Sequence, residues 1–170
     1  GSTEPRVARC LRLHAGTGSG KTHSLLEAPS ALQDHLVKEA AVAGTKAPPP
    51  WRDVYITFNQ EQKMVLDSHR SSASEAAILR VLLRLMNFSN LTCDRVRTVL
   101  EPYKSSLDLQ RLLELVVLYL SKYHPGKSLF ITADECRKLG KDCAMLVASA
   151  FGRLAAKVWT ELGLRCTVLM

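Results

Sequence analysis

The chain has 170 residues, of which 46% are hydrophobic, so it can bury one core of ordinary domain size. Its formal net charge is +7, but the 23 lysines and arginines are spread along the chain, so contact with RNA or DNA is permitted without being indicated. The scattered cysteines imply neither a metal cluster nor a disulfide framework, and no apolar run is long enough to span a bilayer, which favours a soluble intracellular protein without a membrane partner.

The first two residues, Gly-Ser, indicate a remnant of cloning, so we expect one domain over residues 3–170. Residues 6–14 alternate loosely between apolar and polar types and run into a glycine-rich segment, which predicts a strand that ends in a tight loop. After Lys21 the apolar residues have helical spacing, so a helix is expected there, kinked or split at Pro29. A run of three prolines then ends it.

Strand and helix patterns alternate through the rest of the chain. Strands are predicted over residues 53–59, 128–135 and 165–170, and helices over 72–88, 93–103, 106–123 and 141–162. The segment 128–135 is apolar until two final carboxylates, as in a strand that is buried on both faces of a parallel sheet. The predicted fold is therefore α/β, a three-layer αβα core around a parallel sheet, truncated after its fourth strand.

The segment AGTGSGKT, residues 15–22, lies between the first predicted strand and the first predicted helix. Backbone N–H groups at a helix N-terminus hold a phosphate chain well, and glycines let the backbone wrap closely around it. A lysine then meets the β- and γ-phosphates, and a hydroxyl reaches Mg²⁺. We therefore expect ATP, or another nucleoside triphosphate, to be bound by Gly16, Thr17, Gly18, Ser19, Gly20, Lys21, Thr22 and His23.

The first position of the usual phosphate-loop pattern holds Ala15 in place of glycine. A chance match to the pattern that allows either residue is on the order of one in a hundred for such a chain. The alternative interpretation, a flexible turn that contains a lysine, is therefore the weaker one.

Hydrolysis needs a second group of residues, and the segment ending in Asp134 and Glu135 supplies the expected types. Thr22 and Asp134 are predicted to hold Mg²⁺, Glu135 to act as the general base, and Lys21 to take part in catalysis by meeting the phosphates. Two ordinary carboxylates at the end of a strand are the alternative. The Asp-Glu pair favours the additional-strand (ASCE, AAA+-like) group of P-loop NTPases, in which the strand at 165–170 would lie between the phosphate-loop strand and the strand ending in Asp134.

Several segments resemble known families. AGTGSGKT resembles motif I of DEAD-box helicases, and ADEC with TVLM after it resembles motif II and the strand that leads to motif III, but ITFNQEQ stands where a P-T-R-E-L-A-like element would follow the second strand. Together GTGSGKTHSLL, VYITFNQEQ, SEAAILRVLLRLM and SLFITADECRKLG look more similar to the ATPase module of trypanosomatid retrotransposon hot spot proteins and the related Crinkler-type NTPases. That resemblance implies an ATPase domain of the nucleus or cytoplasm, often joined to a nuclease-like or other effector part.

The resemblance also draws attention to Asn59 and Arg80. Asn59 would end the second strand near the phosphates and orient water, with a strand-terminating turn residue as the alternative. Arg80 is expected to form a surface or structural ion pair rather than to act as a catalytic finger.

The leading functional expectation is an ATP-binding, Mg²⁺-dependent ATPase module whose hydrolysis drives a conformational change in a larger assembly, with a protein partner or a further C-terminal domain. One alternative is the core of a superfamily 2 type helicase or translocase acting on nucleic acid, and another is a non-hydrolysing nucleotide-binding scaffold. The sequence ends at Met170, where a sensor residue, a fifth strand and an arginine finger would follow. Turnover by this chain alone is therefore expected to be inefficient.

Overall fold

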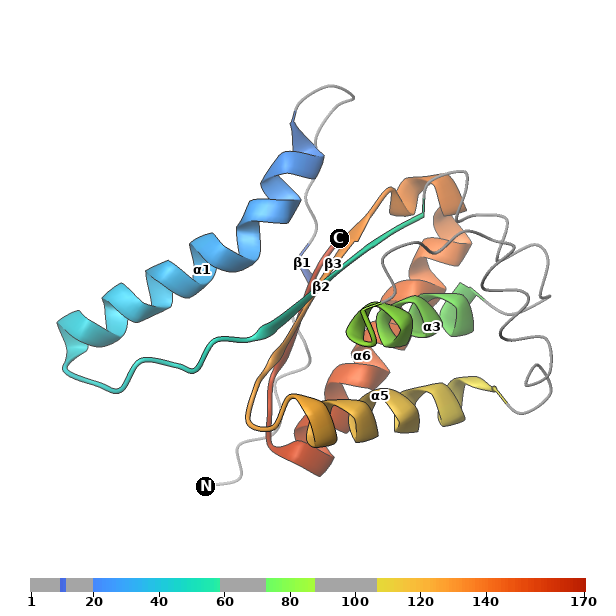
Figure 1. Ribbon diagram of the computed structural model, residues 1–170. Coiled ribbons are helices and arrows are strands. Elements are labelled where there is room, and N and C mark those ends of the chain that lie inside the picture. Colours follow the sequence, from blue (N-terminus) through green and yellow to red (C-terminus); the bar gives the residue numbers. More distant parts are fainter. Residues whose placement is uncertain (1–9, 12–19, 59–72, 88–106) are drawn as a thin grey trace.

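The computed structural model describes residues 10–11, 20–58, 73–87 and 107–170 (Figure 1). The strands are β1 (Cys10–Leu11), β2 (Arg52–Thr57), β3 (Leu129–Asp134) and β4 (Cys166–Leu169). The helices are α1 (Lys21–Ala43), α3 (Ala73–Leu85), α5 (Leu109–Tyr123) and α6 (Lys141–Leu162), with a short 3₁₀ helix, η2 (Cys136–Leu139), directly after β3. The predicted α/β class is confirmed. The helix predicted over residues 93–103 lies outside the described residues.

Helix α1 runs through Pro29 as one helix, so of the two effects expected at this proline, a kink or a split, the split is wrong. Proline removes one helical hydrogen bond and crowds the preceding turn. The ring of Pro29 is buried, and Pro29 is one of only three buried residues in α1. This apolar burial offsets part of the lost hydrogen bond.

The four strands form one parallel sheet in the order β1-β4-β3-β2. β4 therefore lies between β1 and the strand that ends in Asp134, which confirms the predicted strand order. The register places Leu11 opposite Leu169, Leu169 opposite Thr132, and Thr132 opposite Tyr55. All four strands thus end at the same edge of the sheet, the edge at which α1 begins.

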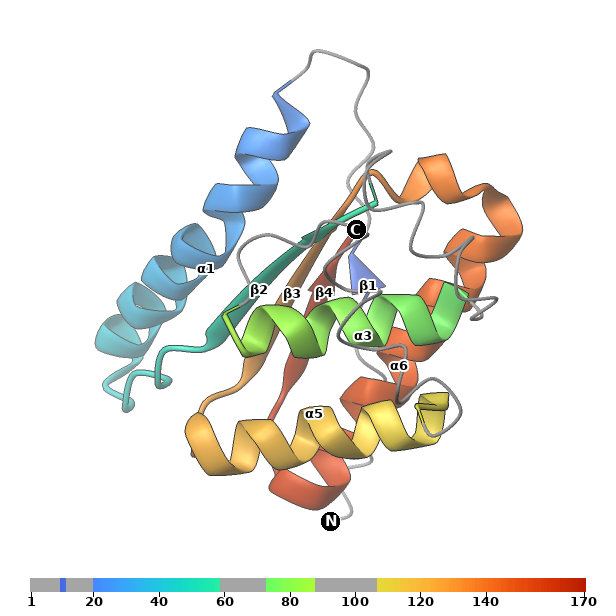
Figure 2. The same ribbon diagram turned by 45° about the vertical axis from the view of Figure 1, so that its right-hand side comes forward.

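The handedness of the connections explains how the helices are distributed. The connection from β1 to β2 crosses from one edge of the sheet to the other. The connections from β2 to β3 and from β3 to β4 run in the opposite direction, each to the neighbouring strand. Because such crossovers are right-handed, α1 must lie on one face and the later helices on the other. Figures 1 and 2 show this arrangement, with α1 opposite α3, α5 and α6. The expectation that helices cover both faces is confirmed.

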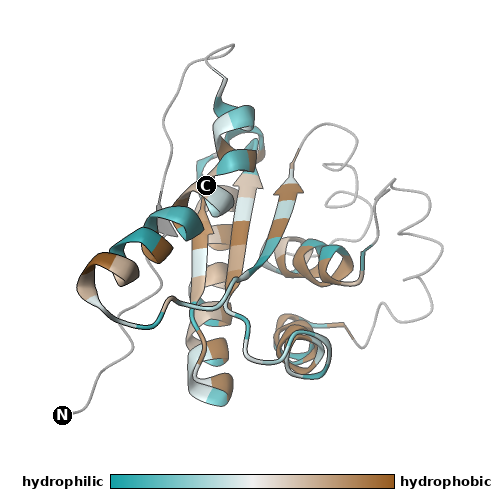
Figure 3. Cartoon of the chain, turned by 60° about the vertical axis from the view of Figure 1, so that its left-hand side comes forward, coloured by the Kyte–Doolittle hydropathy of each residue, from teal (hydrophilic) through white to brown (hydrophobic). Residues whose placement is uncertain are grey.

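The two faces differ in character. The hydrophobic core lies between the sheet and α3, α5 and α6, where α3 contacts β2, α6 contacts β4, and α5 packs on the other two helices. On the other face α1 buries only Leu25, Pro29 and Ala40, and the strands present half-buried Tyr55 and Thr57. Figure 3 shows hydrophobic residues on the strands and polar residues along much of α1. The face under α1 can therefore hold polar groups.

Strand β3 is the centre of the fold, since all 6 of its residues are buried, as predicted for a strand covered on both faces. Helix α6 has the bounds expected from the sequence, and Gly163 ends it in the left-handed conformation, with φ 64° and ψ 19°. Among the described helices, none combines the length and the apolar character that a bilayer-crossing segment needs.

Candidate functional site

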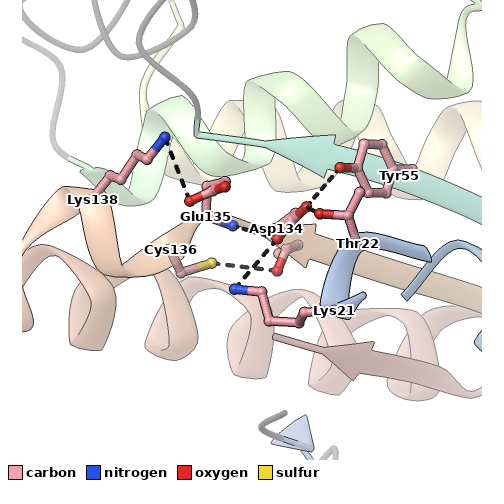
Figure 4. A network of polar contacts seen from close by, with 8 residues as sticks. Lys21, Thr22, Tyr55, Asp134, Glu135, Cys136 and Lys138 are labelled. Carbon is pink, nitrogen blue, oxygen red and sulfur yellow. Dashed lines mark hydrogen bonds and ion pairs between the residues drawn. The ribbon is translucent and has the colours of Figure 1, made fainter. Parts of the chain in front are cut away.

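Three side chains from distant parts of the sequence converge on Asp134, the last residue of β3 (Figure 4). Lys21 and Thr22 come from the first turn of α1, and Tyr55 comes from β2. Because β3 is buried along its whole length, the carboxylate of Asp134 is only 2% exposed. The cluster lies where the carboxyl ends of parallel strands meet a helix N-terminus, the place where open α/β sheets commonly bind ligands.

The start of α1 depends on Gly20, which precedes the helix with φ 76° and ψ 18°. This left-handed conformation has no steric penalty for glycine. The carbonyl of Gly20 accepts the first helical hydrogen bond, from the N–H of Ser24 at 3.0 Å, and no side chain caps the helix. The turn therefore aims the positive end of the helix dipole, with Lys21 and Thr22, at the edge of the sheet.

The Asp134 carboxylate accepts three hydrogen bonds and forms one ion pair. Oδ2 accepts from the hydroxyl of Thr22 at 2.7 Å and from the hydroxyl of Tyr55 at 2.9 Å. Oδ1 accepts from the backbone N–H of Glu135 at 2.8 Å, and the Nζ atom of Lys21 lies 3.6 Å away. A buried charge is tolerated only when it is paired and hydrogen-bonded, and this carboxylate satisfies both conditions.

The electrostatics of the cluster keep the carboxylate ionised. Burial alone would raise the pKa of Asp134, and the hydrogen bonds from Thr22 and Tyr55 oppose that effect. The N–H of the next residue and the charge of Lys21 act in the same direction, so the pKa lies below its ordinary value. Burial and the bond to Asp134 raise the pKa of Tyr55 to about 12, so this hydroxyl stays a proton donor at neutral pH.

The predicted general base, Glu135, adopts a different orientation. Its backbone is left-handed, with φ 62° and ψ 23°, a conformation that few residues other than glycine adopt. The chain thereby turns sharply from β3 into η2, and the carboxylate lies 3.6 Å from the Nζ atom of Lys138 (Figure 4). Glu135 therefore contacts Asp134 through its N–H while its side chain is paired with a lysine.

The other predicted binding residues fall into two groups. The described residues do not include Gly16, Thr17, Gly18, Ser19 or Asn59. His23 is described, but its Nε2 atom lies 3.1 Å from a carboxylate oxygen of Glu27 one turn along the helix, and its side chain is 75% exposed. The structure thus brings together Lys21, Thr22 and Asp134 from the predicted set and leaves the side chain of His23 outside the cluster.

The sequence interpretation did not identify Tyr55. The signal was present in the alternation of β2, where Val54 and Ile56 are buried on the face of the main core. Tyr55 therefore points to the opposite face, the one under α1. Its contact with Asp134 depends on the pairing of β2 with β3, in which Thr57 lies opposite Asp134 and Tyr55 two residues earlier.

Of the two positions expected for Arg80, a surface ion pair or a structural one, the surface position is wrong, since Arg80 is only 3% exposed. Its guanidinium lies over the ring of Phe58, 4.6 Å from the centroid, and donates to the carbonyl of Ala76. Such a stacked arginine packs as an apolar group while its charge faces the aromatic ring. Arg80 therefore belongs to the packing between α3 and the end of β2.

The donor set at Asp134 fits Mg²⁺. A hydroxyl and an ionised carboxylate are hard oxygen ligands, and Mg²⁺ bound to phosphates typically uses only one or two carboxylates from the protein. Within the described ranges, no group of three or more histidine, cysteine, aspartate or glutamate side chains is placed to hold a metal ion. Thr22 and Asp134 supply a hydroxyl oxygen and a carboxylate of this kind, 2.7 Å apart.

Comparison of the chain with protein-family models, with curated proteins and with solved structures found no match. The resemblance to the hot spot and Crinkler-type ATPase modules therefore stays a prediction. What is observed is a parallel sheet in an α/β fold, whose carboxyl edge brings together a lysine, two hydroxyls and a carboxylate.

Proposed function

We propose that this chain is a P-loop ATPase module that binds ATP and Mg²⁺ at the cluster around Asp134. The observation that carries the proposal is the approach of Lys21 and Thr22 to Asp134, with the threonine and the aspartate 112 positions apart in the sequence. The strand order, with β4 between β1 and β3, supports the same proposal because it is the order expected for the additional-strand group.

Each residue of the cluster has a chemical role in this proposal. Lys21 binds the β- and γ-phosphates with its ammonium group. Thr22 and Asp134 would hold Mg²⁺ with a hydroxyl oxygen and a carboxylate. Glu135 orients the attacking water and accepts its proton.

Mg²⁺, when bound, neutralises the negative charge that develops on the transferred phosphoryl group. The contacts around Asp134 favour its ionised form and largely shield it from solvent. The side chain of Lys21 is 23% exposed and thus accessible to a ligand. Phosphate binding would give the ammonium of Lys21 a new partner in place of Asp134. The ion pair between them therefore serves as the resting state of the site.

Equilibrium binding of ATP tests the first half of the proposal. Lys21→Met is expected to weaken binding about 10- to 100-fold, because a hydrogen bond to a charged group contributes about 1.5–3 kcal/mol. Lys38→Met is the matched control, since Lys38 is an exposed lysine of the same helix. The unfolding midpoint of the unchanged protein should also rise with Mg²⁺-ATP concentration, as linkage requires. Equal affinity in both variants would contradict a phosphate-binding role for Lys21.

Phosphate release tests the second half. Glu135→Gln is expected to bind Mg²⁺-ATP as tightly as the unchanged protein and to hydrolyse it at least 100-fold more slowly, because a general base contributes about 10²–10⁴ in rate. The carboxylate of Glu135 is paired with Lys138, and this observation favours a second candidate function, a non-hydrolysing scaffold. Tight binding of Mg²⁺-ATP with no phosphate release above that of Glu135→Gln would select the scaffold.

A further inference from the structure

The hydroxyl of Tyr55 contacts the candidate metal ligand from outside the phosphate-binding segment. Tyr55 lies on β2, opposite Thr132 in the sheet, and its hydroxyl reaches forward to Oδ2 of Asp134 at 2.9 Å. In Figure 4 the ring lies on the β2 side of the carboxylate, and Thr22 approaches from α1. Asp134 is therefore held between helix α1, through Thr22, and strand β2, through Tyr55.

The two hydroxyls that share Oδ2 are not equivalent. Thr22 is one of the residues proposed to bind Mg²⁺, so its hydroxyl would have the cation as a further partner when Mg²⁺ is bound. Tyr55 is carried by β2, which pairs with β3 over its whole length, and its side chain has only two rotatable torsions before the ring is fixed. The donor that can hold Asp134 in one orientation in every state is therefore Tyr55.

The remaining contacts of the carboxylate leave this orientation undetermined. The N–H of Glu135 fixes Oδ1 at 2.8 Å, but a single bond to the adjacent backbone still permits rotation about the Cβ–Cγ bond. Lys21 is a flexible cation at 3.6 Å and is expected to turn to phosphate when nucleotide binds. With both Thr22 and Lys21 engaged elsewhere, Tyr55 is the side chain that keeps Oδ2 aligned.

We propose that Tyr55 is a positioning residue that sets the affinity of the site for Mg²⁺ by orienting Asp134, without contacting the nucleotide. This role rests on the proposed ATP and Mg²⁺ binding. Partners that orient a metal ligand through a hydrogen bond usually change metal affinity about 10- to 100-fold when they are removed. Tyr55 is thus expected to act on the cation dependence of binding and not on nucleotide recognition itself.

Tyr55→Phe tests the role because it removes only the hydroxyl and keeps the ring. The Mg²⁺ concentration that gives half-maximal enhancement of ATP binding is expected to rise about 10-fold, with ATP affinity in EDTA changed less than about twofold. Saturating Mg²⁺ should restore the affinity for ATP. Tyr123→Phe, at a tyrosine of α5 that is 56% exposed, is the matched control and should leave both quantities unchanged.

The outcomes separate the two levels of the proposal. If the unchanged protein binds no Mg²⁺-ATP, the proposed function is refuted and the role of Tyr55 with it. If the unchanged protein binds and Tyr55→Phe has the same Mg²⁺ dependence, only the role of Tyr55 is refuted. A lower unfolding midpoint with unaltered Mg²⁺ dependence has the same meaning, because it shows a purely structural hydroxyl. Equal weakening of ATP binding with and without Mg²⁺ also overturns the role.

Discussion

Replacing Asp134 by asparagine is expected to destabilise the protein at neutral pH. The substitution keeps the shape of the side chain but removes its charge and turns one acceptor oxygen into an amide group. If the amide takes the position of Oδ2, it faces the hydroxyls of Thr22 and Tyr55, which now donate to that oxygen at 2.7 and 2.9 Å. Two charge-assisted hydrogen bonds are then lost in a place that is only 2% exposed.

The magnitude follows from these two bonds. A hydrogen bond to a charged group contributes about 1.5–3 kcal/mol, so the loss of both would cost about 3–6 kcal/mol. Both hydroxyls can rotate to accept from the amide, and a neutral hydrogen bond recovers about 1 kcal/mol each. The expected decrease in the free energy of unfolding is therefore about 1–4 kcal/mol. For a domain of this size each kcal/mol corresponds to about 2–4 °C in the unfolding midpoint.

Urea unfolding of the two proteins as a function of pH is the assay. The pKa of Asp134 is lowered below its ordinary value of 3.8, so the folded state favours the ionised form. Such a group stabilises the fold above its unfolded pKa, and this contribution is lost as the pH falls through the folded pKa. The difference between the unchanged protein and Asp134→Asn should therefore be largest at neutral pH and shrink in acid below 3.8.

Asp53→Asn is the control, because it makes the same chemical change at an exposed position of the adjacent strand β2. Its stability should stay within about 0.5 kcal/mol of the unchanged protein. If Asp134→Asn is as stable as the unchanged protein at neutral pH, the reasoning fails. The donors around Asp134 would then not outweigh the cost of burying its charge.

Three further perturbations follow from the same contacts. Leu25→Ala should lower the free energy of unfolding by about 2–5 kcal/mol in urea titrations, because Leu25 is fully buried on the inner side of α1. Leu26→Ala, at 53% exposure, is the control and should change it by less than about 0.5 kcal/mol. Similar effects of the two substitutions would contradict the observed orientation of the helix. Lys138→Met should raise the rate of phosphate release by a factor of about five at most, since its exposed ion pair with Glu135 is worth no more than about 1 kcal/mol. A slower rate would show that Lys138 assists the reaction. Burial and the bond to Asp134 raise the pKa of Tyr55 from 10.0 to about 12, and a raised pKa contributes stability that is lost as the pH rises through it. Urea titrations should therefore show that Tyr55→Phe loses less stability than the unchanged protein between pH 10.0 and about 12. Identical alkaline curves would show that Tyr55 ionises as freely in the folded protein as in the unfolded chain.

Local patterns determined much of the fold from the sequence. The bounds of α6 were predicted because its apolar spacing ends at a glycine that can adopt the left-handed conformation, and Gly163 does so. The continuous apolar run before Asp134 predicted a fully buried strand, as β3 is. These signals are carried by neighbouring residues, so they can be read without knowing what the rest of the chain does.

Pro29 and Arg80 show where local rules fail. A proline inside a helical pattern usually interrupts it, yet α1 continues through Pro29, whose ring is buried. An arginine on a helix is usually exposed, yet Arg80 is buried against the ring of Phe58. In both cases tertiary packing compensates a local cost, and such packing is not visible in the sequence around the residue.

The sequence by itself determined the chemical types at the site, a glycine-preceded Lys21 and Thr22 at a helix start and Asp134 at a strand end. Only the tertiary structure decided that Tyr55 shares Asp134 with Thr22, although the tyrosine and the aspartate are 79 positions apart in the sequence. The physical reason is register, because a shift of one residue between β2 and β3 would turn Tyr55 to the opposite face of the sheet. Helix and strand signals are local, whereas a contact between strands depends on the packing of the whole core.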